Sequence, residues 1–172
     1  MSSEQKPLLT DAVREIKKHS SIVQIGSIAT LQERKTMNAL IRIARDQLKR
    51  DPEQRTFSCD IGILKRLTGG KDNDNAELKA ALRTLQALQF EFNILHKDDS
   101  RERKLLGFMS EVSIKEEGRG KHTTIEFEFP TSIWEAVKNP NMFVKLDLVI
   151  IRGLESKHSI VLYEVLKDYL NL

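Results

Sequence analysis

The residues of this 172-residue chain that could do chemistry are basic and polar side chains in one short helical segment. Lys79 and Arg83 lie four positions apart and Gln86 follows three positions later, so one face of a helix would carry all three. Lys and Arg neutralise phosphate charges, while Arg and Gln also bond to base edges. The spacing favours contact with duplex DNA. A charged, solvent-facing helix explains the same residues equally well.

Further basic residues surround this segment. Two of them lie in the helical segment before it, one lies in the turn that joins the two segments, and two lie in a later turn between strands. Together with the three residues above they form the candidate DNA-binding set: Lys65, Arg66, Lys71, Lys79, Arg83, Gln86, Arg119 and Lys121. Three others lie in an expected loop before a strand and are additional wing candidates: Arg101, Arg103 and Lys104. Acidic neighbours dilute this positive field: Glu77, Asp98, Asp99, Glu102, Glu116 and Glu117.

Catalytic and metal-binding motifs are incomplete in this sequence. Gly69–Lys71 lacks the Ser or Thr that follows the lysine of a phosphate-binding loop, and Gly118–Lys121 fails in the same way. A calcium loop starting at Asp72 would need glycine where Glu77 stands. The four histidines have no metal-ligand spacing, and the single Cys59 excludes a disulfide framework. We therefore expect a protein that is not an enzyme, with no metal and no cofactor.

The elements that must position the basic residues follow from caps and hydrophobic periodicity. Thr30 and Glu33 form a capping box that starts a long helix, and Asp51-Pro52 ends it. A brief strand at Thr56–Ser58 then leads into a helix over roughly Asp60–Leu67.

The doublet Gly69-Gly70 stops that helix, and a polar turn separates it from the next one. A second capping box, from Asp74 to Glu77, opens a helix with four residues pointing inward: Leu78, Ala81, Leu82 and Leu85. The order is that of a helix-turn-helix with a turn longer than the usual 3–4 residues.

An alternation with period two follows and predicts a three-stranded antiparallel sheet. We place its strands at residues 90–94, 106–114 and 123–129, with a charged loop over 97–104. A helix-turn-helix followed directly by a β-hairpin is the winged-helix arrangement. The predicted fold class is therefore α+β, a winged helix flanked by additional helices.

The two ends of the chain carry further predicted elements. A short helix capped by Thr10 reaches Ile16, and a short strand follows between residues 20 and 27. After the sheet we expect a short helix beginning at Pro130, an extended segment at 143–148 and a closing helix over about Ser156–Leu170. The closing helix would turn one stripe to the core, with His158 packed on it: Leu162, Val165, Leu166 and Tyr169.

Composition sets broad limits on the class of protein. The chain has 28 Lys and Arg against 25 Asp and Glu, a net charge of +3, which permits a nucleic-acid partner without demanding one. No apolar run approaches the ~20 residues of a membrane helix, and no secretory signal opens the chain. We expect one domain, a cytoplasmic location, no membrane partner and a buried Cys59 thiol.

The run from Leu146 to Tyr169 resembles the end of the first winged-helix domain in plasmid replication initiators, the iteron-binding Rep proteins. The resemblance is carried by a set of residues in the closing helix: Ser156-Lys157, Ser159, Leu162-Tyr163-Glu164, Lys167 and Tyr169. Residues 57–67 and 77–94 fit the helix–turn–helix–strand order of that family, and 125–134 fits its strand-Pro-helix junction.

The resemblance implies partners that the spacing of residues does not show. Such initiators carry two winged-helix domains: the second reads iteron repeats, and the first contacts adjacent DNA and supports dimerisation. Dimers repress their own gene at an inverted repeat, while monomers bind the origin iterons and help host replication proteins open it. The implied partners are double-stranded DNA, a second copy and host replication proteins, in a bacterial cytoplasm. Residues 1–172 would be the first domain, with 1–8 flexible and the second domain absent.

Two other functions remain open at this point. The domain could be a dimerisation module without DNA contact of its own, pairing through a sheet edge or its closing helix. It could also be a winged-helix transcriptional regulator on the same fold.

Overall fold

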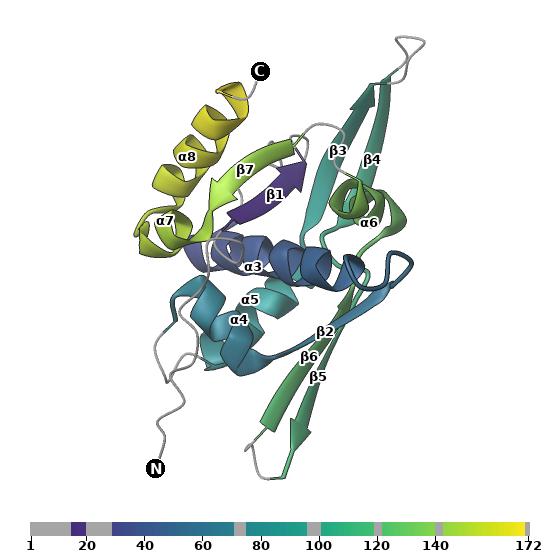
Figure 1. Ribbon diagram of the computed structural model, residues 1–172, viewed down its shortest axis with the longest axis vertical. Helices are drawn as coiled ribbons and strands as arrows, with labels where there is room; N and C mark the ends of the chain where they lie inside the picture. Colours follow the sequence, from purple (N-terminus) through teal and green to yellow (C-terminus); the bar gives the residue numbers. More distant parts are fainter. Residues whose placement is uncertain are drawn as a thin grey trace.

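The computed structural model is built around one long helix, α3 (Leu31–Leu48) (Figure 1). The structure describes residues 15–19, 29–70, 75–95, 101–118, 122–139 and 143–170, and the account below concerns these. The Thr30 hydroxyl accepts a hydrogen bond from Glu33 N at 3.3 Å, and the Glu33 carboxylate accepts one from Thr30 N at 2.8 Å. The predicted capping box is confirmed. Helix α3 supplies the centre of the core, since Leu40 and Ile41 are fully buried.

The helix-turn-helix is present as predicted. Strand β2 (Thr56–Asp60) leads into α4 (Ile61–Thr68), and α5 (Asn75–Ala87) follows. The Asp60 carboxylate caps α4 by accepting from Gly62 N at 2.6 Å. Gly69 ends α4 with φ of 77°, a left-handed conformation that glycine adopts at least cost. The predicted turn at 71–73 and the start of the capping box at Asp74 lie outside the described residues.

A three-stranded antiparallel sheet completes the motif. Strand β6 (His122–Glu128) lies between β2 and β5 (Glu111–Glu117), with Phe127 opposite both Phe57 and Val112. One strand precedes the two motif helices and a hairpin follows them in the same sheet, and this arrangement is a winged helix. The predicted fold class is confirmed. We call the β5–β6 hairpin the wing.

The membership of the predicted sheet was wrong. Strand β3 (Gln89–Leu95) pairs with β4 (Arg101–Gly107) in a separate hairpin rather than with β6. Residues 101–104, predicted as loop, belong to β4. The predicted strand 106–114 is not continuous. Its first residues end β4 and its last residues begin β5, and between the two strands the chain turns and buries Phe108 and Met109 in the core.

A third sheet joins the two ends of the chain. Strand β1 (Glu15–His19) pairs antiparallel with β7 (Phe143–Asp147), and Ile16 lies opposite Leu146. The prediction of a helix that reaches Ile16 is wrong, because its strand partner lies far along the chain and local sequence carries no sign of it. The rest of that helix and the predicted strand between residues 20 and 27 lie outside the described residues.

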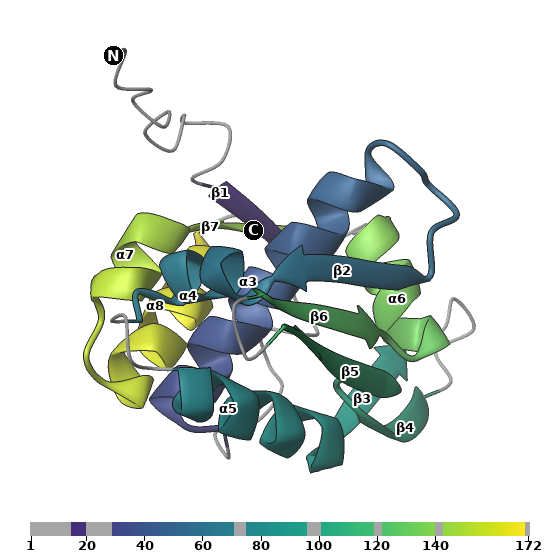
Figure 2. The same ribbon diagram turned by 90° about the horizontal axis from the view of Figure 1, so that it is seen from below.

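Three helices close the domain: α6 (Thr131–Lys138), α7 (Leu148–Gly153) and α8 (Lys157–Tyr169). Helices α6 and α8 and the extended segment at β7 confirm the predictions. Helix α7 was not predicted; the Asp147 carboxylate caps it by accepting from Val149 N at 2.8 Å. Helix α7 packs against both α3 and α4 (Figure 2).

The predicted orientation of α8 is wrong. Leu162, Leu166 and Tyr169 are 59%, 52% and 71% exposed, and His158 is exposed as well. The face turned to α3 carries Ile160 and a fully buried Glu164. Periodicity assumes that the apolar stripe faces the core, and it fails where a buried ionic contact orients the helix instead.

Candidate nucleic-acid interface

Helix α5 presents its polar residues on the face predicted for them. Leu78, Leu82 and Leu85 are fully buried against the core, so the opposite face of the helix turns to solvent. Arg83 and Gln86 are exposed on that face, and Lys79 is partly exposed. The structure therefore brings three of the predicted site residues together on one rigid element.

The charge of Lys79 is countered by the wing. Its Nζ forms an ion pair with the Glu116 carboxylate of β5. The hydrogen bond from Lys79, together with its charge, holds the pKa of Glu116 below its usual value. Among the described residues Arg83 has no ion-pair partner. The guanidinium of Arg83 is thus the available cation of α5, and Lys79 couples α5 to the wing.

The remaining predicted residues divide into two groups. Lys65 and Arg66 lie in the last turn of α4, where the helix dipole favours positive charge. Arg66 is exposed but lines a pocket between α3, α4 and α7 rather than the surface of α5. Three of the predicted residues lie outside the described part of the chain, two of them in the sequence between the wing strands: Lys71, Arg119 and Lys121.

Several charged residues that the sequence analysis did not select have defined roles. Arg34 Nη1 donates to Glu164 Oε2 at 3.2 Å, and Asn38 Nδ2 donates to Glu164 Oε1 at 2.8 Å, which fastens α8 to α3. The signal for this cluster was Glu164 within the otherwise apolar run from Ile160 to Leu166. Arg42 of α3 and Arg50, which lies in the turn directly after α3, line the pocket that includes Arg66.

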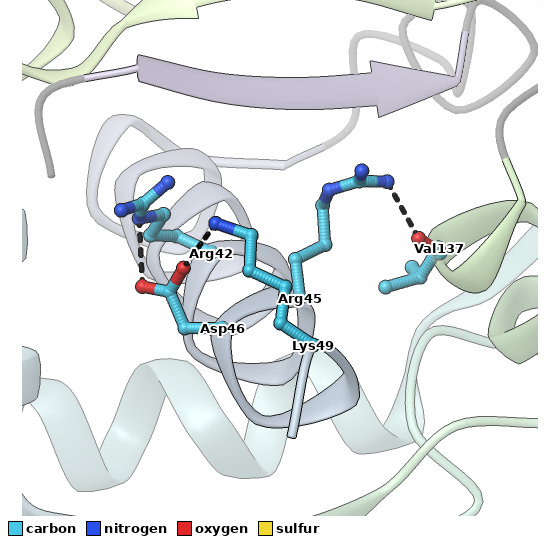
Figure 3. A network of polar contacts seen from close by, with 5 residues as sticks. All are labelled: Arg42, Arg45, Asp46, Lys49 and Val137. Atoms are coloured by element: carbon cyan, nitrogen blue, oxygen red, sulfur yellow. Dashed lines mark hydrogen bonds and ion pairs between the residues drawn. The ribbon is translucent and has the colours of Figure 1, made fainter. Parts of the chain in front are cut away.

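A second polar network secures the C-terminal half of α3 (Figure 3). The Asp46 carboxylate forms an ion pair with Arg42, whose Nε lies 3.0 Å away, and accepts a hydrogen bond from Lys49 Nζ at 3.1 Å. Arg45 points to the other side and donates to the carbonyl oxygen of Val137 at 2.7 Å, which ties α3 to α6. Partial burial lowers the pKa of Arg45, and the nearby charge of Arg42 lowers it further.

The thiol of Cys59 is buried, as predicted. Desolvation, and secondarily the charge of Asp60, raise its pKa to about 12, so the thiol is neutral near pH 7. Within the described ranges, no three His, Cys, Asp or Glu side chains converge as metal ligands. A search of the same ranges finds no helix with the length and apolarity needed to cross a membrane.

Two motif helices on a central helix, a sheet of order β2-β6-β5 and a hairpin wing define a winged-helix domain. The chain belongs to the family described as "Initiator Replication protein, WH1", which matches residues 15–167. The resemblance to plasmid replication initiators is thereby confirmed.

Two solved structures are similar to this chain. The first contains domains 2 and 3 of RctB: the TM-score is 0.56 at 12% identity, over 99% of this chain and 67% of that one. The second is the WH1 domain of MSBI1.176, a replication protein isolated from a multiple sclerosis patient, with a TM-score of 0.47 at 11% identity over 84% of this chain and 99% of that one. At such identities the likeness to RctB concerns the fold. Comparison with curated protein sequences gives no match.

Proposed function

We propose that this chain is the DNA-binding and dimerisation domain of a plasmid replication initiator and that it acts without catalysis. Membership of the initiator family supports a role in replication initiation. The observation that carries DNA binding is the solvent-facing side of α5, where Arg83 and Gln86 are exposed beside the wing. Within this proposal the domain supports origin binding and autorepression, and works with host replication proteins in the bacterial cytoplasm.

The shape of α5 supports this role. Its 13 residues make a rod about 20 Å long, and the B-DNA major groove, ~12 Å wide, admits a helix. Because the leucines of the opposite face are fully buried, α5 would meet DNA as a preformed element. The wing would lie along the same surface, since Glu116 of β5 touches Lys79 of α5.

The expected DNA affinity is modest and sensitive to salt. Each phosphate contact contributes a slope of about −0.9 to the dependence of log K on log salt concentration. Two contacts, from Lys79 and Arg83, would therefore contribute a slope of about −1.8. The net charge of only +3 adds little long-range attraction.

Fluorescence anisotropy with a labelled origin duplex at several salt concentrations tests whether α5 binds DNA. We expect Lys79→Ala combined with Arg83→Ala to weaken binding and to lower the salt slope by about two units. A control pair, Lys49→Ala with Lys157→Ala, removes the same charge away from α5 and should leave the slope unchanged. Equal slopes for the two double variants would remove α5 from the interface.

Dimerisation is the second part of the proposal, and the β3–β4 hairpin is the surface that we assign to it. In the described part of the chain neither strand pairs with a third one. An isolated two-stranded hairpin is marginally stable, and an open edge is a template for another strand. Leu105 of β4 is also 71% exposed. Pairing with the same hairpin of a second copy would make a four-stranded sheet.

Light scattering during gel filtration tests the assignment of the dimer surface. Leu105→Lys should raise the dimer dissociation constant at least tenfold, because a charged side chain discourages edge pairing. The matched substitution Leu166→Lys places the same charge on the exposed stripe of α8. If only Leu166→Lys dissociates the dimer, the closing helix is the interface and the hairpin assignment is wrong.

One observation favours a second candidate, an interaction module that does not bind DNA. The ion pair with Glu116 leaves Lys79 with reduced positive potential. A dimer with no affinity for the origin duplex even at 50 mM salt would support that alternative and refute DNA binding by α5.

A further inference from the structure

A cavity of about 950 Å³ opens between α3, α4 and α7, on the surface where Arg66 lies. Four arginines line it, and we call it the arginine pocket: Arg42, Arg50, Arg66 and Arg152. Its volume is near the upper end of the range for small-ligand sites. Neither the α5 surface nor the β3–β4 hairpin contributes a lining residue.

The positive charge of the arginine pocket is only partly balanced. Asp46 is the one acidic residue in the described part of the lining, and Arg42 and Lys49 already engage its carboxylate (Figure 3). The side chains of Arg50, Arg66 and Arg152 are exposed and reach the pocket from the turn after α3, from α4 and from α7. Four guanidinium groups against one carboxylate give the described lining of the pocket an excess of positive charge.

The wall between the arginines is apolar and its polar groups are occupied. Ile43 and Leu67 line it, and Ile63 is 40% exposed towards it. The Gln47 amide donates to Ser58 O at 2.6 Å and accepts from Ser58 N at 3.3 Å. A ligand would therefore find guanidinium donors around an aliphatic surface.

Arg152 is held at the mouth of the pocket by a close fit. Its Nη1 donates to Arg66 O at 3.4 Å, and its own carbonyl oxygen accepts from Lys35 Nζ at 2.8 Å. A Cβ atom at Gly69 would lie 2.3 Å from Cγ of Arg152, so only glycine lets this side chain pass over the end of α4. Helix α7 and the turn after α4 thus form one edge of the site.

We infer that the arginine pocket binds an acidic peptide segment of a partner protein, with a leucine or isoleucine on the apolar wall and carboxylates on the arginines. Arginine matches carboxylate geometry and can bind it in a bidentate manner. A nucleotide fits less well, because no aromatic ring among the described lining residues could stack on a base.

A labelled peptide of sequence Asp-Glu-Leu-Glu-Leu-Leu, followed by fluorescence anisotropy with the full chain, tests this inference. A second peptide with Ser in place of each Leu measures the part due to charge alone. We expect Arg50→Glu and Ile63→Ser each to weaken binding of the first peptide at least fivefold. Arg83→Glu, an equal charge reversal on α5, is the matched control and should change binding less than twofold.

Three results would overturn the inference: no binding of the leucine peptide up to 1 mM, equal affinity for the serine peptide, or equal losses from Arg50→Glu and Arg83→Glu. A fourth result would also overturn it: Ile63→Ser and Arg50→Glu lower the affinity for duplex DNA as much as they lower the affinity for the peptide. The pocket would then be part of a DNA-binding surface. Normal DNA binding by these two variants, together with weakened peptide binding, keeps the two sites distinct.

Discussion

Glu164 on α8 offers the sharpest test of how the domain holds together. Its carboxylate is fully buried, with Arg34 on one oxygen and Asn38 on the other. Replacing Glu164 by Ala leaves the guanidinium of Arg34, which is 1% exposed, buried without this counter-charge. Removing one partner of a buried ion pair costs about 3–5 kcal/mol.

That loss is a large part of the stability of a domain. The free energy of unfolding of a domain is about 5–15 kcal/mol, so Glu164→Ala should remove at least about a fifth of it. With a urea m-value of about 2 kcal/mol/M, the unfolding midpoint would fall by roughly 1.5–2.5 M. Far-UV circular dichroism during urea titration at pH 7 measures the shift.

Two controls separate the buried pair from other effects. Glu135→Ala removes an exposed carboxylate of α6 and should change the free energy of unfolding by less than ~0.5 kcal/mol. The triple replacement Arg34→Met, Asn38→Leu and Glu164→Leu removes both charges of this pair, so it should recover most of the lost stability. The reasoning fails if Glu164→Ala costs under ~1 kcal/mol, or if the triple variant is less stable than the single one.

Three further predictions follow from other contacts. Glu116→Gln should strengthen DNA binding in an anisotropy titration, because it removes the carboxylate that competes with phosphate for Lys79; an unchanged affinity would contradict this. Burial raises the pKa of Cys59 to about 12, so iodoacetamide at pH 8.5 should alkylate the native protein at least ~100-fold more slowly than the urea-unfolded protein. Mass spectrometry measures both rates, and similar rates would mean that the thiol is accessible. Gly69→Ala should lower the free energy of unfolding by roughly 1–3 kcal/mol in a urea titration, because φ is 77° and Arg152 occupies the space of a Cβ; an unaffected midpoint would refute the close fit.

The candidate interface was predictable in part because its geometry is that of a single helix. Residues 79, 83 and 86 share a face of α5 by helical periodicity alone, and the leucines opposite them reveal which face turns to the core. The partner of Lys79 was not predictable, because Glu116 belongs to a strand 37 residues later. The arginine pocket was missed for the same reason, since its four arginines come from three helices and the turn after α3.

The sequence by itself determined the elements that depend on neighbouring residues. These elements depend on residues only a few positions apart, so local sequence patterns predict them. They include the helix caps at Thr30 and Asp60, the glycine that ends α4 at residue 69 and the alternation of β6. Membership of the initiator family was also readable in the closing helix, around Glu164.

Only the tertiary structure decided which strands share a sheet and which way α8 faces. Both depend on contacts between distant residues: Phe57 pairs with Phe127, and Arg34 bonds to Glu164 across 130 positions. An alternating strand carries no mark of its partner, and an apolar helix stripe does not show whether the core or another surface will cover it. On α8 a buried carboxylate outweighed the apolar stripe, because an ion taken out of water must keep its partner while exposed leucines cost the folded chain comparatively little.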